Sequence, residues 1–74
     1  MVADIRRLIS AQPFVPFTIH LADGGEVHVP TVDHAHVFPT GNRFMVIHDD
    51  DSYDLMPPLL ISRITVNGEA IQTA

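Results

Sequence analysis

The chain has no cysteine, no lysine and no tryptophan. Without cysteine it can form neither disulfides nor thiolate zinc sites. Its only strong cations are four arginines, which stand against nine acidic residues and leave a formal net charge of −5 at pH 7. Because a broad phosphate-binding surface needs clustered cations, this charge balance argues against general nucleic-acid binding.

Long apolar runs and catalytic motifs are also missing. No stretch approaches the roughly 20 apolar residues of a membrane-spanning helix. The N-terminal segment carries Asp4, Arg6 and Arg7 instead of the continuous apolar run of a signal peptide, so we expect a soluble, cytoplasmic protein. The sequence holds no nucleophile elbow and no phosphate-binding loop, and we therefore expect no enzyme activity and no cofactor.

The chain is short but apolar, with 74 residues of which 46% are hydrophobic. We expect residues 1–74 to form a single small domain. A domain of this length buries a modest core and has limited stability alone. Since disulfides are excluded, oligomerisation is one of the remaining ways to stabilise it.

The clearest local pattern is a hairpin over Phe17–Pro30. Apolar and polar residues alternate on both sides of Asp23-Gly24-Gly25, which is the period of half-buried strands. The two glycines favour a three-residue turn with a glycine bulge. The register that we infer from this turn places His20 opposite His28.

The remaining chain predicts one helix, further short strands and a frayed end. An apolar stripe at positions 2, 5, 8 and 9 predicts a helix over about 2–12, which Pro13 ends. The fold class is therefore α+β, mostly β, with the helix followed by a strongly bent five- to six-stranded antiparallel sheet. An open five-stranded sheet with the helix on one face is the alternative. The β-rich part covers about 14–67, with later strands at 34–38, 43–48, 53–56 and 61–66, and the tail over 69–74 is expected to be frayed.

The segment Phe44–Ile47 is apolar at four successive positions, so both faces of this strand favour burial. One helix and one small sheet cannot easily cover both faces. We therefore expect a homo-oligomer, or docking of another protein, as the function of this module. The candidate interface residues are Ile5, Leu8, Ile9, Phe44, Met45, Val46, Ile47, Leu59 and Leu60.

The order of one helix followed by short, bent strands resembles the Sm-like barrel, which is related in shape to SH3-like barrels. The hairpin from Phe17 through Ile19, Leu21 and Gly24 to Val27 is similar to the first Sm hairpin. Ile61–Thr65 is similar to the last strand of the bacterial Sm-like RNA chaperone. The resemblance implies a small barrel that assembles into rings.

An Sm-like ring also implies the alternative function of binding single-stranded RNA. The RNA-binding motifs of that family do not carry over, because Met56-Pro57-Pro58-Leu59 stands where the chaperone has a basic, aromatic segment. An RNA site would have to use arginines and stacking aromatics from elsewhere. The candidates are Arg43, Phe44, Tyr53 and Arg63.

The chain also resembles a group of short uncharacterised bacterial proteins. The residues that carry this second resemblance are the helix, the segment Gln12–Phe17 (QPFVPF) and the LADG turn at Leu21–Gly24. No activity is implied by it.

Five histidines are many for a chain of this length. His34 and His36 are two apart on one expected strand, and His20 and His28 face each other in the expected hairpin, so these four are candidate metal ligands. A solvated strand face explains the same pattern, and we favour that interpretation, with no metal site. Several histidines in an acidic protein also suggest the hypothesis that the oligomer responds to pH between about 5 and 7.

Two charged clusters have ordinary explanations. His48-Asp49-Asp50-Asp51 offers carboxylates to a calcium or magnesium ion, but it lacks the glycine and the distal glutamate of an EF-hand loop. We interpret it as an acidic turn that protects a sheet edge. Arg6 and Arg7 could join Arg43 and Arg63 in a basic patch of an oligomer, or could be separate solvated charges.

Overall fold

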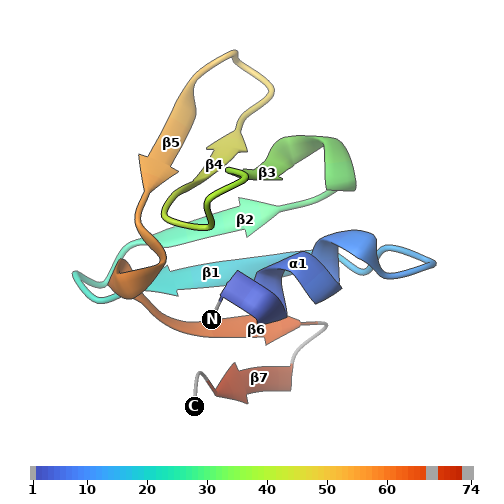
Figure 1. Ribbon diagram of the computed structural model, residues 1–74, viewed down its shortest axis with the longest axis horizontal. Coiled ribbons are helices and arrows are strands. Elements are labelled where there is room, and N and C mark those ends of the chain that lie inside the picture. Colours follow the sequence, from blue (N-terminus) through green and yellow to red (C-terminus); the bar gives the residue numbers. More distant parts are fainter. Residues whose placement is uncertain (1, 67–68, 73–74) are drawn as a thin grey trace.

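The computed structural model describes residues 2–66 and the backbone of 69–72. Its helical elements are α1 (Val2–Ser10) and the short 3-10 turns η1 (Val32–His34) and η2 (Pro58–Leu60). The strands are β1 (Phe17–Leu21), β2 (Glu26–Val29), β3 (Ala35–Val37), β4 (Phe44–Ile47), β5 (Tyr53–Met56), β6 (Ile61–Val66) and β7 (Glu69–Gln72). One helix followed by short strands confirms the predicted α+β, mostly β class (Figure 1).

The described strands form two antiparallel sheets, which do not close into a barrel. One sheet has the order β2-β1-β6-β7 and the other has the order β3-β4-β5. The expectation of a single bent sheet was therefore wrong for the described residues. Pro30 and η1 separate β2 from β3, while Pro57, Pro58 and η2 separate β5 from β6. Proline cannot donate to a strand ladder, so each of these segments interrupts pairing and redirects the chain.

The predicted hairpin is present, but its register differs from the predicted one by two residues. His20 lies opposite Glu26, and His28 lies opposite Thr18. The Leu21 amide donates to the Gly25 carbonyl over 2.8 Å, so the turn starts one residue earlier than expected. Gly24, rather than Gly25, has the positive φ, +92°, and this places the bulge at Gly24.

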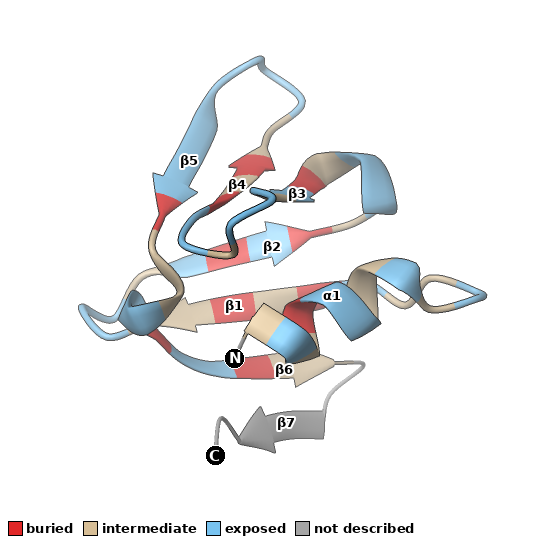
Figure 2. Cartoon of the chain, in the orientation of Figure 1, coloured by how far each residue is buried: buried red, intermediate tan, exposed pale blue. Residues whose placement is uncertain are grey.

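The helix α1 ends at Ser10, two residues before the predicted end. It packs beside β3 and lies in front of β1 in the view of Figure 1. Ile5 is its fully buried residue. Both sheets supply side chains to one core (Figure 2). The most deeply buried large side chains are Phe17, Phe44, Ile5, Ile19, Ile64, Val29 and Val46.

The tail that we expected to be frayed contributes a strand. Glu69–Gln72 forms β7 and pairs antiparallel with β6, with Ile64 opposite Ile71. Pairing to β6, which is already part of the core, gives the backbone of β7 hydrogen-bond partners. Residues 73 and 74 lie outside the described residues.

Candidate interaction surface

The outer face of the β3-β4-β5 sheet carries an apolar patch. Met45 pairs with Leu55, and Ile47 pairs with Tyr53, so these four side chains share the face that points away from the core. We call these four residues the outer patch. Tyr53 is 62% exposed and Leu55 is 50% exposed, while Met45 and Ile47 are half-buried.

The strand that carries the exposed half of the patch also has a free edge. β5 is the last strand of its sheet, and among the described residues no strand pairs with its other side. The His48 amide donates to the Ser52 carbonyl over 2.8 Å. Because pairs alternate along an antiparallel ladder, the peptide groups of Asp54 then face β4, and those of Tyr53 and Leu55 face the open edge.

The turn at the tip of this hairpin is organised by short-range hydrogen bonds. Asp50 accepts hydrogen bonds from the Ser52 hydroxyl and from the Ser52 amide. These two bonds, the hydroxyl first, lower the pKa of Asp50 from its ordinary value of 3.8. Asp51 has a positive φ of 71°, and His48 Nε2 lies 2.8 Å from Asp54 Oδ2. The acidic segment is thus an ordered turn that closes the hairpin.

The structure divides the predicted interface residues into three groups. Ile5, Phe44 and Val46 are fully buried in the core and present no surface to a partner. Leu8 and Ile9 are half-buried and pack against that core. The remaining four are on the surface: Met45 and Ile47 in the outer patch, and Leu59 and Leu60 in η2, where Leu59 is 95% exposed.

The RNA-binding candidates do not form one surface. Phe44 is fully buried, so its ring offers no face for stacking on a base. Tyr53 is exposed on β5. Arg43 precedes β4, whereas Arg63 lies on β6 in the other sheet.

The four histidines named as metal ligands do not converge either, and three of them make contacts with other neighbours. His34 ends η1, while His36 lies on β3, so they do not share a strand face as expected. Within residues 2–66, no three metal-binding side chains converge on one point. The contacts are His20 with Glu26 (3.4 Å) and Thr65 (2.7 Å), His28 with Thr18 (3.1 Å), and His34 with Thr31 (2.7 Å) and Asp49 (2.8 Å).

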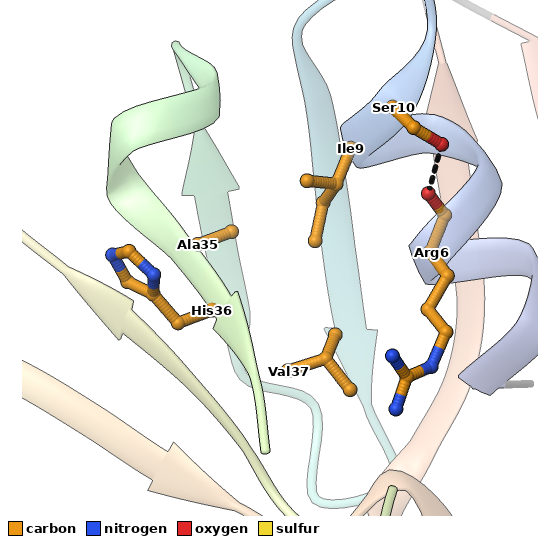
Figure 3. Close-up of a pocket in the computed structure, with 6 residues that line it drawn as sticks. All are labelled: Arg6, Ile9, Ser10, Ala35, His36 and Val37. Carbon is orange, nitrogen blue, oxygen red and sulfur yellow. Dashed lines mark hydrogen bonds between the residues drawn. The ribbon is translucent and has the colours of Figure 1, made fainter. Parts of the chain in front are cut away.

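A groove of about 390 Å³ lies between α1 and β3, and sequence analysis did not predict it (Figure 3). Ala35 and Val37 point toward the helix, and the His36 side chain points away from it. The groove depends on packing between two segments about thirty residues apart, so no local pattern signals it. Its lining is Arg6, Ile9 and Ser10 from α1 and Ala35, His36 and Val37 from β3.

Comparisons with models of protein families, with curated proteins and with solved structures give no match. The resemblance to Sm-like proteins therefore has no support from these comparisons. Among the described residues, no helix has the length and apolar character needed to cross a bilayer.

Proposed function

We propose that this chain is a non-catalytic assembly module that associates with further copies of itself through the outer patch. The main support for the proposal is that β5 has both exposed apolar side chains and an unpaired edge. Tyr53 and Leu55 expose apolar side chains, and the peptide groups of the same two residues face an unpaired sheet edge. An edge of this kind is a template for pairing with another strand.

Charge supports a second copy as the occupant. None of the four residues of the outer patch is acidic or basic, so the patch itself brings no like charges together, and Asp54, between Tyr53 and Leu55, lies on the other face of β5. Arg43 stands at one end of β4, and the acidic turn Asp49–Asp51 stands at the other. In a two-fold arrangement with antiparallel strands, the basic end of one copy lies near the acidic end of the other.

The order of one helix followed by short strands supports a relationship with Sm-like proteins, and the ring-forming habit of that family agrees with self-association. The division into two open sheets counts against a closed barrel. The Sm-like relationship is thus a proposal about the fold alone, separate from the interface.

The test is the mass in solution over a range of protein concentrations, by light scattering and native mass spectrometry. We expect a discrete oligomer. Leu55→Ser should weaken a two-fold dimer by at least about tenfold, because Leu55 is 50% exposed and burying that half in both copies is worth roughly 1.5–3 kcal/mol together. Leu59→Ser is the matched control, since it removes an equally apolar side chain from η2, outside the patch.

A monomer at every concentration would refute the proposal, and so would equal weakening by both variants. Titration with oligo-U and oligo-A at low salt tests the alternative RNA-binding function. Salt-sensitive binding that survives Leu55→Ser would favour RNA over self-association as the role of the module.

A further inference from the structure

The groove between α1 and β3 has the chemistry of a small-molecule site. We propose that it binds an amphipathic monocarboxylate, an acid with a single carboxylate and an apolar body. The carboxylate pairs with Arg6, and the body covers the half-buried Ile9 and Val37, beside the almost fully buried Ala35. This proposal does not depend on self-association, because the outer patch lies on other residues.

The charge of Arg6 is available at the groove. Its Nη2 donates to the carbonyl of Phe38 over 3.2 Å, which holds the guanidinium in place. Among the described residues, no carboxylate lies within ion-pair distance of Arg6, whereas the neighbouring Arg7 pairs with Asp4. A guanidinium has five N–H donors in a planar fork that matches a carboxylate. One N–H of Arg6 donates to the Phe38 carbonyl, and its other N–H groups can donate to the carboxylate of a ligand.

The rest of the groove favours an apolar body. Ala35 is buried, and Ile9 and Val37 pack against the core at the groove wall. The His36 side chain points away, so it brings no second charge (Figure 3). The volume of about 390 Å³ is near the lower end of the range of roughly 300–1,000 Å³ for small-molecule sites.

The geometry also sets the orientation of the ligand. The groove has two ends in the view of Figure 3. The Arg6 guanidinium and Val37 lie at one end, and Ile9, Ala35 and Ser10 lie toward the other. The Ser10 hydroxyl donates to the Arg6 carbonyl over 2.6 Å, so its proton is already used. Because α1 ends at Ser10, that end of the groove also carries the partial negative charge of a helix C-terminus. The carboxylate therefore belongs at Arg6 and the apolar tail toward Ser10.

A single cation distinguishes this site from a phosphate site. Multiply charged phosphate groups are typically held by several donors, such as clustered basic side chains or a helix N-terminus. The groove offers one guanidinium, and the helix end beside the groove is a C-terminus, whose partial negative charge disfavours a further anionic charge. A monoanion is the ligand that this arrangement matches.

Octanoate is the probe, and its binding to the full chain is followed through amide chemical shifts in two-dimensional NMR. We expect millimolar or tighter binding, with shifts confined to the amides of Arg6–Ser10 and Ala35–Val37. Acetate tests the carboxylate alone, octanol tests the apolar body alone, and octyl phosphate tests the dianion. Each should bind at least about tenfold more weakly than octanoate.

Arg6→Gln should reduce octanoate affinity by at least about tenfold, since it removes the charge and keeps a polar side chain. Arg43→Gln is the matched control and should leave affinity unchanged. Arg6→Lys keeps the positive charge but lacks the planar N–H fork of the guanidinium, so it should bind octanoate with intermediate affinity. It also provides the test if Arg6→Gln fails to fold. The proposal is overturned by no binding at millimolar octanoate, by equal binding to Arg6→Gln, or by shifts centred on Tyr53–Met56.

Discussion

At the scale of single residues, the β4–β5 turn shows how one side chain can set the protonation of another. The Ser52 hydroxyl and amide both donate to Asp50, and these bonds stabilise its ionised form. They hold the pKa of Asp50 below 3.8. A folded-state pKa below the unfolded one stabilises the fold above about pH 4, and this contribution is lost as the pH falls through the folded value.

Ser52→Ala should raise the pKa of Asp50 toward 3.8, because it removes the hydroxyl bond, which is the largest cause of the shift. The measurement is a carboxyl carbon NMR titration of Asp50 in acid. Thr at position 52 keeps the hydroxyl and is the control, so Ser52→Thr should retain the lowered value. An unchanged titration midpoint in Ser52→Ala would show that the hydroxyl does not hold this carboxylate.

At the scale of elements, the sequence predicted which segments form strands better than it predicted how they pair. The bounds of β5 and β6 agree with the prediction, because prolines and turn residues flank both segments. The β1–β2 register was wrong because two adjacent glycines can each occupy the bulge position, and period-2 alternation does not choose between them. β7 was missed because 69–74 was interpreted as a frayed tail, although the Asn67-Gly68 pair before it is a hairpin signal in the sequence.

Gly24→Ala tests the register of this hairpin. With φ at +92°, the residue is in a conformation that a side chain disfavours, even though open space surrounds the position. We expect a loss of about 1 kcal/mol in the free energy of unfolding, measured by urea denaturation. Gly24→Asn should lose less, because asparagine enters left-handed conformations more readily. A Gly24→Ala variant as stable as the parent protein would be evidence against the glycine bulge at this position.

At the scale of the whole molecule, the helix and the two sheets share one core. Ile64 belongs to the larger sheet, Phe44 to the smaller one and Ile5 to α1, and all three are fully buried. Local patterns identified these residues as apolar. They could not distinguish a core position from an interface position, because that depends on which face of β4 the helix and the second sheet cover. The same limit applies to the groove at Arg6, which exists only once α1 has packed beside β3.

Substitution of Phe44 and of its neighbour Met45 distinguishes a core position from an interface position. Phe44 is fully buried, and Met45 lies on the outer patch. Phe44→Ala should lower the free energy of unfolding by about 3–5 kcal/mol, a large part of what a small domain has. Ile64→Val, a milder change in the other sheet, should cost about 0.5–1.5 kcal/mol and keep the chain folded. Both are measured by denaturation under conditions where the protein is monomeric.

Met45→Ala should affect self-association more than the stability of the monomer. Under the same monomeric conditions it should change unfolding far less than Phe44→Ala, since the side chain is only half-buried. In the concentrated protein it should weaken self-association, because it removes apolar surface from the outer patch. If Met45→Ala destabilised the monomer as strongly as Phe44→Ala, the outer face of β4 would be part of the core of one chain, and the reason for a second copy on that face would be gone.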